Sequence, residues 1–191
     1  MASLGHFAIG MVAARVYRRR VERGSLAASM AWWSAVSMFP DADVIGFAFG
    51  VRYADPWGHR GATHSFAFSI GVAIVFAVLA PLVRAKPWRT FGVASVVLAS
   101  HAVLDTLTDG GLGCALLWPF DDQRYFAPWN PIPVAPIGKR FFSGAGLHVA
   151  LTELMLFAPL FAYALWPRGR ADGASGSLAA DEAPALGDTD A

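Results

Sequence analysis

Histidine and aspartate residues recur in separate parts of this chain at spacings that suit a metal ion. His101 and Asp105 are four residues apart, so that on a helix both side chains reach one ion. Asp41 and Asp43 follow Pro40, and alternation along that stretch would direct both carboxylates into one site. A hydrogen-bonded His–Asp pair is the alternative for the first motif and a turn for the second.

Three further histidines join these motifs. His59 and His64 lie in a polar, glycine-containing stretch directly before an apolar segment. Thr63 or Ser65 could cap a helix there, which would explain part of the stretch but not the two imidazoles. His6 is the earliest candidate, and a packed core histidine is its alternative interpretation.

Together these residues predict a metal centre with nitrogen and oxygen ligands. Cys114 is the sole cysteine, so a multi-cysteine zinc site is excluded. We expect zinc, with manganese, magnesium or iron as alternatives, and two ions that share carboxylates. Asp41 and Asp105 would be catalytic as well as metal-binding. The predicted ligands are His6, Asp41, Asp43, His59, His64, His101 and Asp105.

Four other charged residues have predicted roles near this centre. Arg60 and Arg124 could hold a phosphate group with two hydrogen bonds each, and Arg60 would also be catalytic. A salt bridge or an interfacial anchor is the alternative for both. Asp109 would orient a ligand or open a turn, and Glu153, an acid within an apolar segment, would have a supporting or general-base role.

The composition indicates what kind of protein positions these groups. Of 191 residues, 55% are hydrophobic and 15% charged, too few charges to cover an ordinary soluble domain. Such a composition also excludes disorder over most of the chain. The net charge of +1 argues against a nucleic-acid binder. A membrane protein is therefore expected, with a very apolar soluble helical bundle as the alternative.

The apolar segments predict an all-α, polytopic membrane bundle of about five helices with a long outer loop over 110–146. The longest segments, of 18 and 21 residues, would extend about 27 and 31 Å, close to the hydrocarbon thickness of a bilayer. Ser25 should cap one helix, and Pro40 should end it. Residues 1–166 would form the membrane-embedded domain and 167–191 a disordered tail. The predicted helices are Leu4–Tyr17, Leu26–Phe39, Phe66–Val83, Phe91–Leu107 and Gly146–Trp166.

The distribution of basic residues predicts the orientation. Ten of the fifteen Lys and Arg residues fall on one side of an up-and-down bundle, so this side should face the cytoplasm. The protein would then lie in the inner (plasma) membrane as a multi-pass protein, with its N-terminus outside and its C-terminus in the cytoplasm. At about 1.5 Å per residue, most of the candidate ligands lie roughly 21–30 Å from the basic side, near the outer leaflet.

At these motifs the sequence resembles the YdjM-type inner-membrane proteins, a family described as metal-dependent hydrolases. The resemblance covers residues 5 to 130 in order, and its most specific part is His-Arg-Gly-x-Thr-His-Ser at 59–65. A more distant similarity joins the early His, Pro-Asp and later His/Asp motifs to zinc-dependent phospholipase C. The apolar helices set this chain apart from that enzyme.

These observations and the resemblance predict a membrane hydrolase of esters or phosphoesters. Its partners would be membrane lipids and a lipid or lipid-linked substrate reached from the outer leaflet, and no nucleic acid. A metal transporter, a sensor or a structural metal protein without hydrolysis is the alternative. A transporter would need polar groups toward the cytoplasmic side, where Phe66–Val83 offers only Ser69.

Overall fold

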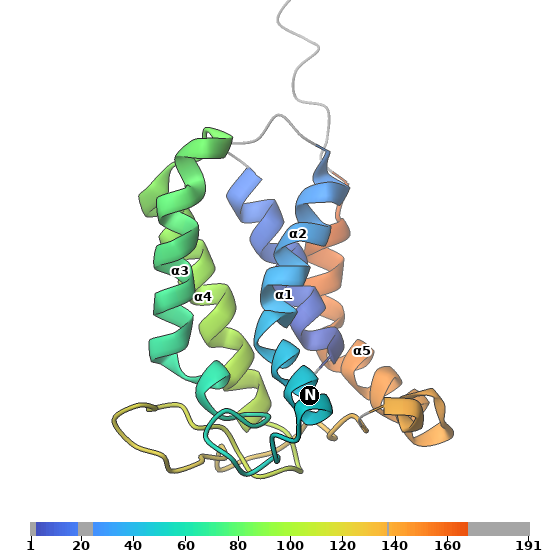
Figure 1. Ribbon diagram of the computed structural model, residues 1–191. Coiled ribbons are helices and arrows are strands. Elements are labelled where there is room, and N and C mark those ends of the chain that lie inside the picture. The colour runs from blue at the N-terminus through green and yellow to red at the C-terminus, as the bar shows by residue number, and fades with distance from the viewer. Residues whose placement is uncertain (1–2, 19–24, 137, 168–191) are drawn as a thin grey trace, which may run out of the picture.

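A computed structural model describes residues 3–18, 25–136 and 138–167 of the chain. The described part is all-helical, as predicted, and its only β pairings are two isolated bridges in loops. Five α-helices alternate in direction, so their ends gather at two opposite ends of the bundle (Figure 1). The helices are α1 (Ser3–Arg18), α2 (Leu26–Met38), α3 (Phe66–Leu79), α4 (Pro87–Thr106) and α5 (Gly144–Leu165).

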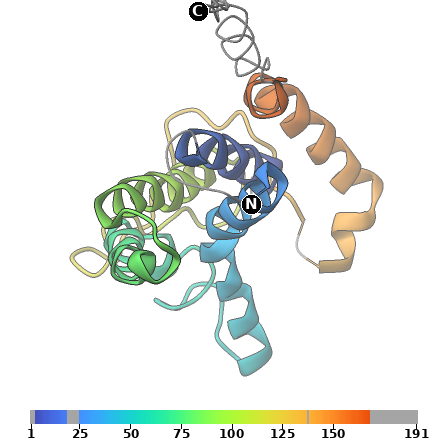
Figure 2. The same cartoon turned by 90° about the horizontal axis from the view of Figure 1, so that it is seen from above.

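The helices pack as two pairs with α5 at the side. α1 packs on α2 and α3 on α4, and contacts of α4 with α1 and α2 join the pairs. Helix α5 packs on α1 and stands apart from α3 and α4 (Figure 2). Two buried side chains fasten α5 to α1: Glu153 accepts hydrogen bonds from backbone N–H groups at the start of α1, and Arg15 donates to carbonyls at the end of α5.

Small residues let α1 and α2 approach closely. A Cβ atom on Gly10 would lie 2.4 Å from the Cα atom of Ser34, so nothing larger than glycine fits without movement. The adjoining core holds Ala13, Ala14 and Trp33 from these two helices, with alanines from α3 and α4. Packing through small residues is characteristic of helices in membranes, where close contact has to replace the hydrophobic drive.

Two helical segments are long and apolar enough to cross a membrane, Phe66–Val83 and Gly144–Leu165. Only 17% of each is buried, so both present apolar side chains outward, unlike the core helix of a soluble protein. With 16 and 13 residues, α1 and α2 extend about 24 and 20 Å. Of the predicted five-helix membrane bundle, the described residues therefore establish five helices, two of them long and apolar.

The helix ends explain how the chain reaches the predicted site. Ser25 caps α2 by accepting a hydrogen bond from Ala28 N, as expected. Pro40 follows the end of α2, but the chain continues as the 3₁₀ helix η1 (Phe39–Phe49) up to Gly50, whose φ is +82°. The short η2 (Ala62–His64) then precedes α3.

The loops on either side of these 3₁₀ helices lie at one end of the bundle (Figure 1). The predicted outer loop over 110–146 is at this end and contains η4 (Gly138–Phe142). At the opposite end, η3 (Ala80–Val83) extends α3. From residue 168 on, the tail predicted to be disordered lies outside the described residues, as do several basic residues used to predict the orientation: Arg19, Arg20, Arg23, Arg168 and Arg170.

Candidate metal centre

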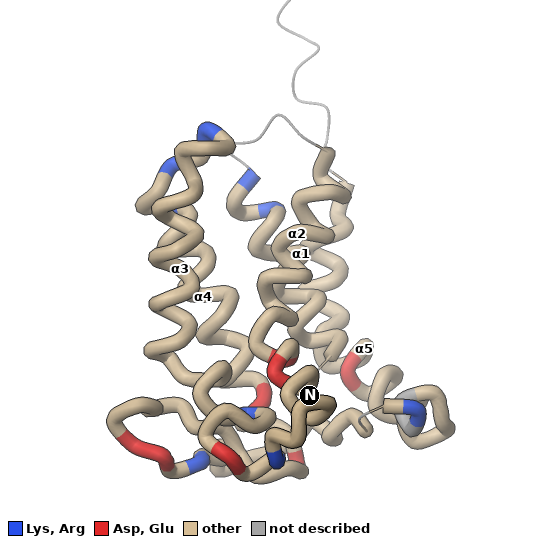
Figure 3. The backbone as a smooth tube through the Cα atoms, in the orientation of Figure 1, with Lys and Arg blue, Asp and Glu red and all other residues tan. Residues whose placement is uncertain are grey.

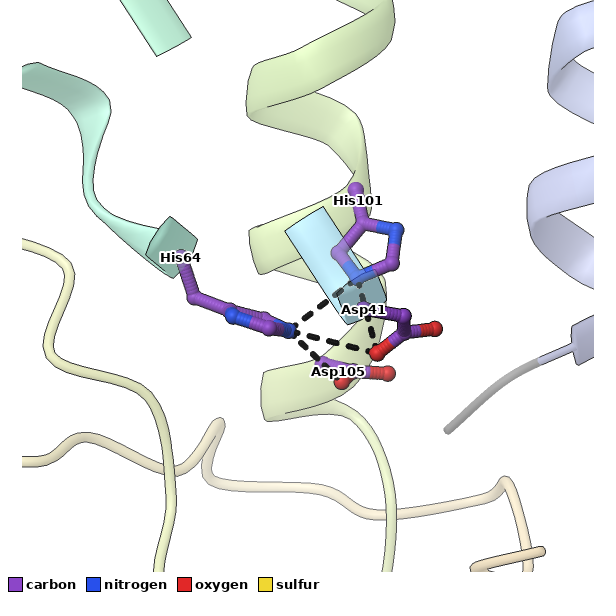
Figure 4. Close-up of side chains that lie close together, drawn as sticks. All are labelled: Asp41, His64, His101 and Asp105. Carbon is purple, nitrogen blue, oxygen red and sulfur yellow. Dashed lines mark hydrogen bonds and ion pairs between the residues drawn. The ribbon is translucent and has the colours of Figure 1, made fainter. Parts of the chain in front are cut away.

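Three chain segments bring four ionisable side chains together beside the loop end of the bundle. Asp41 comes from the first turn of η1, His64 from η2, and His101 and Asp105 from successive turns of α4. Figure 4 shows their nitrogen and oxygen atoms pointing toward one another. His64, His101 and Asp105 are fully buried, and Asp41 is 4% exposed. Together they form a group that could hold a metal ion.

The spacing of the donor atoms suits one small cation. His64 Nε2 lies 3.1 Å from His101 Nε2 and 3.5 Å from carboxylate oxygens of both Asp41 and Asp105. His101 Nε2 lies 3.4 Å from Asp41 Oδ1. Four tetrahedral ligands bound to zinc at about 2.0–2.1 Å would be separated by about 3.3 Å. Four of the six separations between the donor atoms are thus close to this edge length, and all six are within 4.8 Å.

Unsatisfied polar atoms also fit a bound cation. Both carboxylate oxygens of Asp41 are buried and accept no hydrogen bond of normal geometry from the described residues. Buried polar atoms without partners are uncommon and call for an explanation such as a bound ion. An ion between Asp41 and the two imidazoles would satisfy them.

The tautomer of His101 follows from its other nitrogen. Its Nδ1 atom lies 2.7 Å from the carbonyl oxygen of Ser37, which can only accept, so Nδ1 carries the proton. Nε2 then presents its lone pair to the cluster. Metal-binding histidines commonly donate their second N–H to a backbone carbonyl in this way, which fixes the ring orientation.

A second group lies next to the first and shares His64. It consists of Asp43, His59 and His64. His59 Nδ1 lies 2.7 Å from Asp43 Oδ1, and the Thr63 hydroxyl donates to Asp43 Oδ2 at 2.6 Å. With contacts to Arg60 N and His64 as well, Asp43 connects four residues of the 59–65 motif.

The structure corrects the alternation expected after Pro40. The chain there coils as a 3₁₀ helix instead of extending, and Asp41 and Asp43 approach opposite nitrogens of His64, at 3.5 and 3.3 Å. Asp41 belongs to the group with His101, and Asp43 to the group with His59.

The charge states suit cation binding. Burial would raise the pKa of Asp41, but the His101 and His64 imidazoles outweigh it and hold that pKa well below its usual value. Asp43 behaves in the same way, since His59 and His64 lower its pKa more than burial raises it. Both carboxylates are thus ionised at neutral pH. Burial lowers the pKa of His64, yet the nearby carboxylates of Asp105, Asp41 and Asp43 raise it overall to about 10.

His6 lies beside the site without joining either group. Its ring stacks on His101 with centroids 3.7 Å apart, and its Nε2 lies 3.3 Å from Asp105 Oδ1. This placement supports two residues of the first group. A ligand role for His6 stays a prediction.

Arg60 reaches the site from a strained backbone conformation. Its φ of +64° lies in the left-handed region, which is uncommon for residues other than glycine, and its side chain is fully buried. Nε lies 3.1 Å from Asp105 Oδ2, and Nη1 donates to the carbonyl of Gly110 at 2.8 Å. Nη2 is buried and has no hydrogen-bond partner in the described part of the chain. Strain of this kind is concentrated at functional sites.

The remaining predicted residues lie farther out. Arg124 donates to the backbone carbonyls of His59, Tyr53 and Asp55, so its guanidinium group holds the histidine loop in place. Asp109 is exposed and accepts a hydrogen bond from Val134 N, an arrangement that suits the turn alternative. The roles predicted for both residues remain untested.

Two supporting contacts were absent from the sequence-based ligand set. The Ser37 carbonyl that orients His101 is a backbone group, so residue type gives no signal for it. Thr63 sits inside the histidine motif and was considered only as a helix cap. Instead, Ser65 caps α3 by accepting from Phe68 N, which leaves Thr63 for Asp43.

Comparison with known proteins agrees with the motif resemblance. The family model described as YdjM inner membrane protein matches residues 1–171. The inner membrane protein YbcI of Escherichia coli (strain K12) is 43% identical over 122 residues, which is 63% of this chain and 70% of that protein. No solved structure matches. The match over nearly the whole described chain shows that this protein belongs to the YdjM inner membrane protein family.

Proposed function

We propose that this protein is an integral membrane metal-dependent hydrolase that acts on an ester or phosphoester of a lipid or lipid-linked substrate at the outer leaflet. The observation that carries the proposal is the buried group of Asp41, His64, His101 and Asp105, whose donor atoms all lie within 4.8 Å of one another, with four pairs at 3.1–3.5 Å. Nitrogen and oxygen donors of this kind suit zinc, with manganese, magnesium or iron as alternatives. A second ion would lie against Asp43, His59 and His64.

The chain's own residues would divide the work around the ion. When bound, the metal would lower the pKa of a water molecule and polarise the scissile group. Asp41 and Asp105 would supply negative charge, and the imidazoles would fix the geometry. Arg60, whose Nη2 has no hydrogen-bond partner among the described residues, would donate to a phosphoryl or carbonyl oxygen of the substrate.

The membrane arrangement follows from charge. In Figure 3, the end of the bundle opposite the site carries basic residues and no acidic ones among the described residues, whereas basic and acidic residues both lie at the end that holds the site. We propose that this basic end faces the cytoplasm, that residues 1–166 form one multi-pass membrane domain with about five spans, and that residues 167–191 form a cytoplasmic tail. The site would then open toward the outer leaflet, where a lipid substrate could reach it.

Metal binding without hydrolysis is the second candidate, and the burial of the cluster favours it. Three of the four side chains in the first group are fully enclosed, and Asp41 is nearly so. A structural metal site is closed by its ligands, whereas a catalytic site keeps one position open for water. A sensor or a structural protein would fit a closed site.

A turnover experiment separates the two candidates. The metal-loaded protein in detergent is incubated with ester and phosphoester substrates, including phospholipids, alongside the variants Asp105→Asn and His148→Ala. His148 is exposed on α5 and serves as the matched control. The proposal predicts turnover that falls at least about 100-fold in Asp105→Asn and is unchanged in His148→Ala. No turnover in the wild type, together with a lower Tm after chelation, would instead favour the structural role.

A further inference from the structure

A large groove lies at the end of the bundle opposite the metal centre. Its volume is about 920 Å³, within the range of small-molecule sites. It forms because α2 and α3 remain apart: none of their Cα atoms lie within 8 Å, and the Trp32–Phe76 ring pair spans the gap. Tyr17 and Thr90, from α1 and α4, also line the groove.

The groove has an apolar wall and a polar upper part. Trp33, Phe76, Leu79 and Val83 contribute the apolar surface, while Ser25 and Arg84 lie at the end of the bundle. From Ser25 to Trp33 the α2 wall spans nine residues, a rise of about 12 Å. A ligand matching this lining has a long apolar part and a polar end.

Two buried polar atoms in the lining have no hydrogen-bond partner among the described residues. Ser29 Oγ and Trp33 Nε1 are enclosed, and neither forms a hydrogen bond with the part of the chain that the structure describes. Tyr17 and Thr90 do not share this property, since their hydroxyl groups are 2.7 Å apart. Since buried donors rarely remain unsatisfied, the two free donors indicate a ligand that carries acceptor oxygens partway down the groove.

A cationic side chain lies at the mouth. Arg84 is exposed, has a left-handed backbone with φ +59°, and forms no recorded ion pair or hydrogen bond through its side chain within the described residues. Arg89 is occupied in contrast, because it donates to the carbonyl of Val16. A guanidinium group beside an apolar groove pairs well with a phosphate.

We infer that this groove binds one phospholipid with an anionic headgroup. The phosphate contacts Arg84, the glycerol ester oxygens accept from Ser29 and Trp33, and one acyl chain lies along Phe76 and Leu79. Because the chain belongs to an inner membrane protein family, we expect the groove between α2 and α3 to be open to membrane lipid. This inference does not depend on the metal centre or on hydrolysis.

Filling the groove tests the acyl-chain site. Ala28 and Ala31 are both exposed on α2, but only Ala28 lines the groove. Native mass spectrometry of the detergent-purified chain titrated with phosphatidylglycerol should show one tightly bound lipid. We expect this adduct to be lost in Ala28→Trp and kept in Ala31→Trp. Equal adducts in both variants, or none in the wild type, would overturn the inference.

Removing the charge tests the headgroup site. Lys86 lies two residues from Arg84, is exposed and does not line the groove, so it is a control for net charge. Arg84→Gln should weaken phosphatidylglycerol binding about fivefold, whereas Lys86→Gln should change it by less than about twofold. Phosphatidylcholine should bind more weakly than phosphatidylglycerol to the wild type. Equal losses in the two variants, or equal binding of the two lipids, would contradict the headgroup assignment.

Discussion

His64 is the residue at which the two candidate ligand groups meet. Its Nε2 faces His101, Asp41 and Asp105, and its Nδ1 lies 3.3 Å from Asp43 Oδ2. Three carboxylates around one imidazole favour its protonated form when no metal is bound. The same carboxylates would attract a divalent cation, which would offset the negative charge that the proton on His64 offsets when no metal is bound. Proton and metal therefore compete at His64.

This competition predicts a pH dependence. The pKa of His64, raised to about 10, keeps the ring protonated at pH 7, whereas a metal ion needs the neutral ring. The pKa values of Asp41 and Asp43 are lowered, so these carboxylates are already ionised and release no proton when metal binds. Zinc binding at pH 7 should therefore expel about one proton from His64, and affinity should rise with pH. Calorimetry in two buffers of different ionisation enthalpy measures this; a binding heat equal in both would contradict it.

Residue types and spacings predicted most of what gathers at the site, but not its grouping. The i, i+4 spacing of His101 and Asp105 places both side chains on one face of any α-helix, and in the structure both lie buried on α4. Whether His6 binds the ion or stacks on His101 depends on how α1 packs against α4. The spacing of residues along the chain gives no information about that packing. The division between Asp41 and Asp43 required knowledge of the 3₁₀ turn.

Among the elements, helix bounds were predictable where capping residues mark them. Ser25 caps α2, which begins at Leu26 as predicted. Helix α4 begins at Pro87, four residues before the predicted start, because proline is tolerated in the first turn of a helix. The continuation of α2 into η1 is not predictable from Pro40 alone, since a proline that ends an α-helix is equally compatible with the first turn of a following 3₁₀ helix.

The contact between α1 and α2 predicts a stability difference between two glycines. Gly10→Ala should lower the free energy of unfolding by about 1–3 kcal/mol, since its Cβ would lie within 2.4 Å of the Ser34 backbone. Gly92→Ala, in α4, meets no atom within 4 Å and should leave stability unchanged or raise it. Thermal unfolding in detergent compares the two. An equal Tm for both variants would mean that α1 and α2 are not packed this closely.

For the whole molecule, the proposed orientation makes the C-terminus cytoplasmic. The supporting observation is that the end of α1, the connection between α3 and α4 and the end of α5 lie at the same end of the bundle (Figure 1). Arg18, Arg84, Lys86 and Arg89 belong to these parts of the chain. A C-terminal tag should therefore be protected from protease in sealed, right-side-out vesicles and cleaved in inverted ones. Cleavage in the right-side-out vesicles would reverse the orientation and place the metal centre at the cytoplasmic leaflet.

Metal analysis of the purified protein tests the central claim most directly, because that claim is a metal ion bound between Asp41, His64, His101 and Asp105. Metal content is measured by mass spectrometry after removal of loosely bound ions, for the wild type, His101→Ala and His148→Ala. We predict tightly bound metal in the wild type and in His148→Ala, and at least about a tenfold loss in His101→Ala. The same metal content in all three proteins, or none in the wild type, would contradict the metal centre.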